Sequence, residues 1–153
     1  MILDSHDRAI LKALQLDGRL PNSALAQQVS LSESACLRRV RALEESGLIE
    51  GYTALLSQRK AGLATNVFVS ITLDRQDEVD LRAFEAAVQT LPEVMECYLM
   101  TGDFDYLLRV VVADMDDFER VHSKHLTRLP GVARVHSSFA LRTVRKSREL
   151  PIR

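Results

Sequence analysis

The chain has 153 residues, of which 46% are hydrophobic and 27% are charged, and its formal net charge at pH 7 is −1. These proportions are those of an ordinary globular protein, and they exclude collagen, a disulfide scaffold and a largely disordered chain. The longest apolar run, residues 107–113, is interrupted by Arg109 and is too short to span a membrane. Because the N-terminus also lacks the layout of a signal peptide, we expect a cytoplasmic protein with no membrane partner.

The N-terminal third of the chain begins with a helical pattern. Residues 4–16 carry apolar side chains at three- and four-residue spacing, which predicts an amphipathic helix that ends before Gly18. Residues 21–29 form a second, shorter apolar pattern, and Pro21 is tolerated in the first turn of a helix. The segment 30–32 then predicts a turn.

A third helix is expected after Ser32, because its hydroxyl can accept a hydrogen bond from a backbone N–H of the first helical turn. Gly47 suits the left-handed backbone that often follows a helix, with Leu48 folding back onto the helix. Three short helices, the last two joined by a tight turn, are the layout of a helix-turn-helix. One face of the third helix is apolar and consists of Cys36, Val40 and Leu43.

A linker separates this helical region from the rest of the chain. Residues 51–66 have no sustained helical period and contain Gly51 and Gly62, so we expect a short strand and a linker here. The natural boundary lies near residue 60. It gives a helix-turn-helix DNA-binding domain with a linker strand at 1–60, and a second domain at 61–153.

The second domain alternates between strand and helix patterns. Hydrophobic alternation predicts strands, three- to four-residue spacing predicts helices, and the tight segment 101–105 predicts a hairpin. The expected elements are a strand at 67–73, a helix at 81–91 that Pro92 stops, strands at 94–100 and 106–112, a helix capped by Asp114, and a strand with Val135, Phe139 and Leu141.

The order β-α-β-β-α-β is ferredoxin-like, with both helices on one face of an antiparallel sheet. The predicted fold class is therefore α+β, an N-terminal winged-type helix-turn-helix joined to a C-terminal ferredoxin-like βαββαβ domain. The helices cover only one face of the sheet, yet the strands carry apolar residues on both sides. We therefore expect a homodimer that forms through the uncovered face.

Basic side chains gather on the third helix, where three of the six basic residues of positions 1–50 fall between 38 and 41. In a helix-turn-helix this element enters the major groove, where arginine pairs with guanine and where serine or arginine contacts phosphate. A solvated charged face is the alternative explanation. The predicted DNA-binding residues are Ser32, Ser34, Arg38, Arg39 and Arg41.

Long blocks of the sequence resemble the Lrp/AsnC family of leucine- and asparagine-responsive regulators, with GYTALL and TGDFDYLL closest to the leucine-responsive branch. The resemblance implies an N-terminal DNA-binding domain, a C-terminal domain that senses an amino acid, and dimers that assemble into octamers or related rings. One departure is Ser30, where many members carry a glycine. Serine costs roughly 1 kcal/mol if the backbone there is left-handed. The blocks are LDSHDRAILKALQLDGRL (3–20), LSESACLRRVRALEESGLIEGYTALL (31–56), ECYLMTGDFDYLLRVVVADM (96–115) and RLPGV (128–132).

The same resemblance places an effector pocket at the loop 101–106, between neighbouring subunits. An α-amino acid requires a carboxylate for its ammonium group and N–H donors for its own carboxylate, and an acidic, glycine-containing loop offers both. An ordinary hairpin turn also favours glycine and aspartate, so it stays the alternative. Leucine or methionine is the expected effector, with no other cofactor. The predicted effector residues are Thr101, Gly102, Asp103, Asp105 and Tyr106 of this loop, with Asp114 at the start of the last helix as a further, secondary candidate.

The predicted function is a sequence-specific regulator that binds double-stranded DNA and whose activity or assembly responds to a small amino acid such as leucine. An architectural DNA-wrapping protein without an effector is the alternative. An enzyme is not expected, because the acidic loop would repel the phosphate that an acylphosphatase of this fold must bind.

Three further features have ordinary explanations. His122 and His125 have no third ligand nearby, so we expect them at the edge of a core or subunit interface and expect no metal site. Cys36 and Cys97 are expected to be free thiols. A solvated C-terminal tail is the default, with contact to DNA or to an acidic neighbouring subunit as the alternative. Its charged residues are Arg142, Arg145, Lys146, Arg148 and Arg153 against Glu149.

Overall fold

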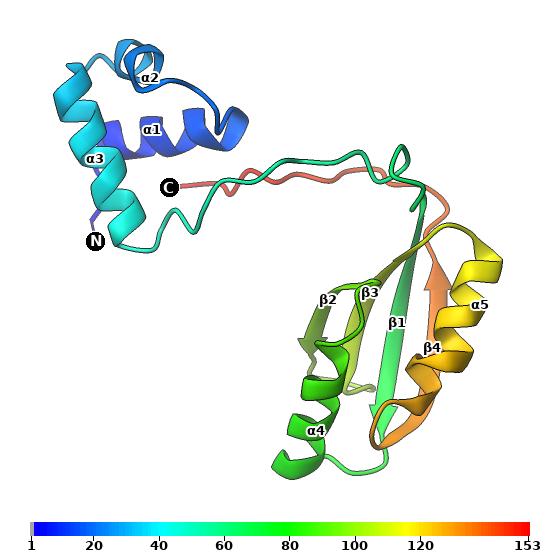
Figure 1. Cartoon of the computed structure of the whole chain (residues 1–153). Helices are drawn as coiled ribbons and strands as arrows, with labels where there is room; N and C mark the ends of the chain where they lie inside the picture. Colours follow the sequence, from blue (N-terminus) through cyan, green and yellow to red (C-terminus); the bar gives the residue numbers. More distant parts are fainter. Residues whose placement is uncertain (1) are drawn as a thin grey trace. The chain divides into compact units, whose positions relative to one another are not determined.

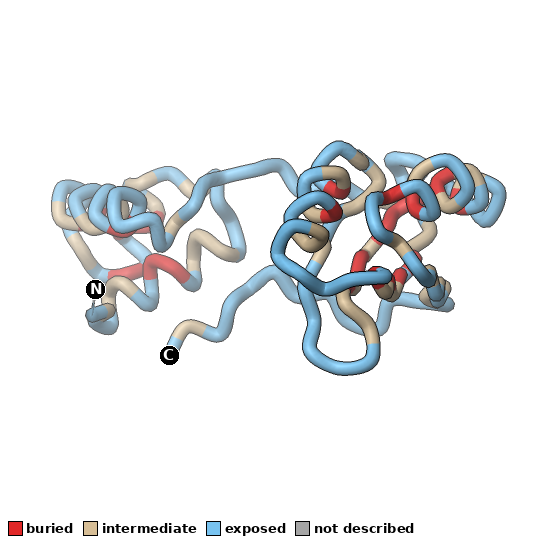
Figure 2. Tube along the Cα trace, turned by 90° about the horizontal axis from the view of Figure 1, so that it is seen from below, coloured by how far each residue is buried: buried red, intermediate tan, exposed pale blue. Residues whose placement is uncertain are grey.

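The computed structural model describes residues 2–153. They form two compact units, one made of residues 2–55 together with Val144–Arg153 and the other of Leu56–Thr143. We call them the helical unit and the sheet unit, and each has its own buried residues (Figure 2). The chain leaves the helical unit after Leu55, near the boundary expected at residue 60, and re-enters it at Val144.

Three helices build the helical unit: α1 (Ser5–Leu16), α2 (Asn22–Gln28) and α3 (Glu33–Glu45) (Figure 1). Asp4 caps α1 through a reciprocal capping box with Asp7. The predicted cap of α3 is confirmed, because the Ser32 hydroxyl accepts from the Ala35 N–H at 3.2 Å. The buried core of the unit is Ile10, Leu11, Leu25, Ala26, Val29, Cys36 and Leu43.

Two turns set the directions of these helices. Ser30, between α2 and α3, has φ of 58°, which is the left-handed conformation that glycine would adopt without strain. Gly47 ends α3 with φ of 77°, as its position predicts. The expectation that Leu48 folds back is wrong, since Leu48 is exposed. Ile49 packs against the core instead, and its N–H donates to the Leu43 carbonyl.

The linker between the units contains turns but no strand between residues 51 and 64, so the predicted linker strand is wrong. A strand needs a neighbour to pair its backbone N–H and C=O groups. The four strands of the described chain pair only with one another.

The sheet unit has the predicted β-α-β-β-α-β order (Figure 1). Its four strands pair antiparallel in the order β2-β3-β1-β4. The second helix is shorter than the apolar pattern suggested, because a 3₁₀ turn at Leu126–Arg128 replaces its end. The elements are β1 (Thr65–Leu73), α4 (Glu78–Val88), β2 (Val94–Leu99), β3 (Tyr106–Val112), α5 (Met115–Lys124) and β4 (Val132–Phe139).

The helices α4 and α5 lie on the same face of the sheet (Figure 1). The alternate residues of β1 that face them, from Val67 to Leu73, are buried. The opposite face stays uncovered, and Phe68 in its centre is 41% exposed beside Arg109 of β3 and Ser138 of β4. Within residues 2–153, no helix is long and apolar enough to cross a membrane.

Candidate functional site

The exposed face of α3 carries polar and basic side chains at helical spacing. Ser34, Arg38 and Arg41 are all exposed, and spacings of four and three residues place them on one side of the helix. Ser32 stands at the same N-terminus, with its hydroxyl 3.3 Å from that of Ser34. Neither Arg38 nor Arg41 forms an ion pair or side-chain hydrogen bond with another residue among positions 2–153. Both guanidinium groups are therefore available to an anionic partner.

Arg39 is oriented differently from its two neighbours. Its Nη1 atom lies 2.8 Å from Asp4 Oδ2 and 2.8 Å from Asp7 Oδ1, both at the start of α1. The pKa of Asp4 falls to about 2, because the Asp7 N–H and then the Arg39 guanidinium donate to its carboxylate. Arg39 thus braces α3 against α1, a pairing that the basic stripe in the sequence did not reveal.

Replacing Arg39 with alanine is expected to lower the melting temperature of the helical unit and to leave Arg38 and Arg41 exposed on α3. The folded pKa of Asp4 lies below its ordinary value of 3.8, so its contribution to stability is complete above about pH 4 and is lost as pH falls towards 2. The variant should lose part of this acid sensitivity. Melting curves between pH 7 and pH 2 measure both effects. Reduced DNA affinity at unchanged stability would return Arg39 to the DNA interface.

Asn22 also positions α3, a role that was not predicted from the sequence. Its side-chain amide donates to the Glu33 carbonyl at 2.9 Å, and it thereby ties the start of α2 to the start of α3. This hydrogen bond between α2 and α3 helps to fix the angle between the two helices of the motif. A polar residue after Pro21 was the available signal.

The loop before β3 divides into an exposed tip and a buried base. Thr101, Gly102 and Asp103 are exposed, and Gly102 has φ of 113° with open space around it. Asp105 is half-buried, and its carboxylate accepts from the Leu73 N–H at 2.7 Å and from the Gln76 side chain at 3.3 Å. Asp105 therefore braces the loop against the end of β1.

Tyr106 belongs to the hydrophobic core. It is only 1% exposed, its ring stacks on Phe84 at a centroid distance of 4.4 Å, and its hydroxyl donates to Glu85 Oε1 at 2.7 Å. Burial and the adjacent carboxylate raise the pKa of Tyr106. The side chain holds the base of the loop to α4 and does not face solvent.

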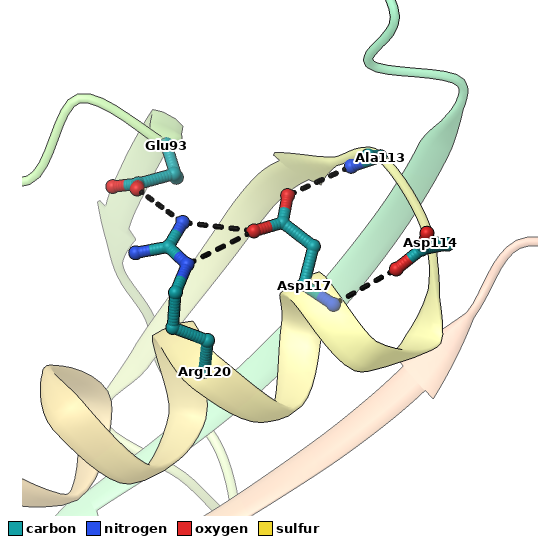
Figure 3. Close-up of polar contacts among 5 residues, drawn as sticks. All are labelled: Glu93, Ala113, Asp114, Asp117 and Arg120. Atoms are coloured by element: carbon teal, nitrogen blue, oxygen red, sulfur yellow. Dashed lines mark hydrogen bonds and ion pairs between the residues drawn. The ribbon is translucent and has the colours of Figure 1, made fainter.

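Asp114 lies away from the loop within one chain. It follows the end of β3 whereas the loop precedes its start, and a strand of this length separates the two by about 20 Å. Its carboxylate caps α5 by accepting from the Asp117 N–H at 2.9 Å (Figure 3). Asp117 in turn accepts from the Ala113 N–H and from Arg120, which also reaches Glu93 (Figure 3).

The histidines and cysteines of the described residues do not gather into a metal site. The His122 ring is 5.9 Å from the Phe118 ring, and His125 ends α5. No group of three or more metal-binding side chains comes together within the described residues. Both cysteines are free thiols, and burial raises the pKa of each.

Comparison with known families assigns both units. Residues 3–50 match the winged helix-turn-helix DNA-binding family, and residues 66–150 match the Lrp/AsnC ligand binding domain. The chain belongs to the Lrp/AsnC family. It is a DNA-binding transcription regulator with a ligand-binding domain, and the family's members are not enzymes.

Individual relatives extend over nearly the whole chain. The leucine-responsive regulatory protein of Salmonella typhimurium is 45% identical over 151 residues, which cover 99% of this chain and 92% of that protein. A transcriptional regulator from Neisseria meningitidis, solved as a complex with L-methionine, is 37% identical with a TM-score of 0.93 and covers 98% of this chain and 97% of its own. An AsnC family regulator from Agrobacterium tumefaciens is 38% identical, with a TM-score of 0.93 and coverage of 97% of each chain.

Proposed function

We propose that this regulator reads double-stranded DNA with the exposed face of α3, through Ser32, Ser34, Arg38 and Arg41. The observation that carries the assignment is the contrast within one basic cluster. Arg39 is held by two aspartates, whereas Arg38 and Arg41 point outward without a partner among residues 2–153. An unpaired arginine on a recognition helix supplies the two parallel donors that guanine accepts.

We further propose that a small apolar amino acid regulates this binding, and that its site includes the exposed loop tip Thr101–Asp103. Asp103 would accept from the ligand ammonium group, and the backbone at Gly102 would donate to its carboxylate. Leu99 and Met100 precede the tip and are exposed, so they offer apolar contacts to a ligand side chain. The L-methionine complex of the Neisseria regulator supports this ligand class, with leucine as the other candidate.

The tip alone is open to solvent and cannot enclose a ligand. A second copy of the chain would supply the missing wall. The uncovered sheet face, which exposes Phe68 and Tyr98, is where we propose that a homodimer forms, with an octamer as the next level of assembly.

A thermal-shift panel of the twenty amino acids tests the regulatory part of this proposal. A ligand that binds only the folded protein stabilises it by RT ln(1 + [L]/Kd), which is about 2.7 kcal/mol at a hundred times Kd. Leucine or methionine should give the largest rise in melting temperature. Asp103→Ala should reduce the rise, whereas Asp105→Ala should lower the starting melting temperature and keep the response.

Asp116→Ala serves as the matched control, because Asp116 is an exposed aspartate of α5 away from the loop. It should leave the ligand response unchanged. A full response in Asp103→Ala would remove the loop tip from the site. Absence of any shift in the unmodified protein would favour the architectural function without an effector.

A further inference from the structure

The C-terminal tail, Val144–Arg153, is an integral part of the helical unit. Leu150 and Gln15 of α1 exchange two hydrogen bonds: the Leu150 N–H donates to Gln15 Oε1 at 2.6 Å, and Gln15 Nε2 donates to the Leu150 carbonyl at 3.2 Å. Ile152 packs against the core of the unit and lines one cavity together with Leu14 and Ile49. The tail is therefore anchored on α1 by polar and apolar contacts.

The tail also reverses the net charge of this unit. Residues 1–55 carry six basic and seven acidic side chains, a net charge of −1, which is unfavourable for a surface that approaches DNA. The tail adds four basic residues and one acidic residue, so the helical unit as folded has a net charge of +2. The net charge of the whole chain, −1, hides this, because the sheet unit carries ten basic and thirteen acidic residues.

The basic side chains that the tail adds are exposed to solvent. Arg145, Lys146 and Arg148 form no ion pair with any described residue of the chain. A groove of about 520 Å³ lies between the tail and α1, and its charged lining is Arg8, Lys12 and Arg145 against Glu149. The tail and the outer face of α1 thus form one cationic surface, which we call the tail surface.

We propose that the tail surface is a second DNA-contacting surface, which binds the phosphate backbone beside the segment that α3 reads. Its tail cations are exposed and lie on a segment with no helix or strand, so they suit phosphate contacts that position the protein without specifying sequence. The proposal rests on DNA binding by α3.

The test is the salt dependence of DNA affinity in the full-length protein. One variant combines Arg145→Gln, Lys146→Gln and Arg148→Gln. A matched control removes three exposed cations of the sheet unit, Arg82→Gln, Lys124→Gln and Arg128→Gln, and so makes the same change in net charge. Melting curves and sedimentation check that both variants keep their fold and assembly.

Each phosphate contact contributes about 0.9 to the slope of log affinity against log salt. We therefore expect the slope of the tail variant to be smaller by up to about 2.7, which corresponds to three lost contacts. If the affinity at about 1 M salt is unchanged, each lost contact weakens DNA binding about eight-fold at about 0.1 M salt. The control should keep the slope of the unmodified protein. Equal losses in both variants, or an unchanged slope in the tail variant, would overturn the tail surface. Failure of the unmodified protein to bind any DNA would instead contradict the role of α3.

Discussion

Replacing Tyr106 with alanine is expected to destabilise the sheet unit by about 3–5 kcal/mol, the usual loss when a buried aromatic side chain is truncated in a core. Tyr106 is 1% exposed and stacks on Phe84, so the substitution leaves a cavity between β3 and α4. Calorimetry of the full chain, in which the two units have separate cores, measures the loss in the transition of the sheet unit.

Tyr106→Phe is the matched control, because it keeps the ring and removes only the hydroxyl that donates to Glu85. The half-buried carboxylate then lacks its donor, which costs about 1–3 kcal/mol. Because Tyr106 does not face solvent, the folded fraction of both variants should still show a rise in melting temperature with the ligand. Normal stability with a lost response in Tyr106→Phe would identify the hydroxyl as a ligand contact instead.

Replacing Arg38 with alanine is expected to weaken DNA binding by about 1–3 kcal/mol and to relax specificity at one base pair. Its guanidinium is exposed and has no partner among residues 2–153, so the melting temperature should stay unchanged. Binding to a panel of single-base operator variants distinguishes base recognition from a phosphate contact, which would weaken binding equally for all sequences.

Arg39→Ala provides the comparison within the same helix. It should show the opposite pattern, with lower stability and retained specificity, because Arg39 contacts Asp4 and Asp7. If Arg38→Ala binds every operator variant as tightly as the unmodified protein, Arg38 takes no part in recognition.

The helices and strands could be predicted from the sequence because their apolar spacing and caps are local. Ser32 and Asp114 cap α3 and α5, and the hydroxyl or carboxylate lies within three residues of the N–H that it accepts. The β-α-β-β-α-β order follows from these local patterns, and the ferredoxin-like arrangement, in which β1 pairs with β3 and β4, is inferred from that order.

The functional assignments of single residues could not be predicted in the same way. The sequence does not distinguish Arg38 from Arg39, because both are arginines on the same predicted helix. Only the packing of α3 on α1 shows that Arg38 is exposed and that Arg39 pairs with aspartates of the α1 N-terminus. In the same way, only the structure shows that Asp105 accepts from the Leu73 N–H whereas Asp103 is exposed. The tail contact joins Gln15 and Leu150, which are 135 positions apart, and no local pattern reports such a pair.

Control of DNA binding by an amino acid is tested most directly by titrating operator DNA with and without leucine and methionine. We predict that one of them changes the affinity by a factor in the usual allosteric range of about 5–150, and that saturating DNA changes the affinity for that amino acid by the same factor. Tight DNA binding that none of the twenty amino acids alters would contradict regulation by an amino acid and would favour an architectural DNA-binding protein.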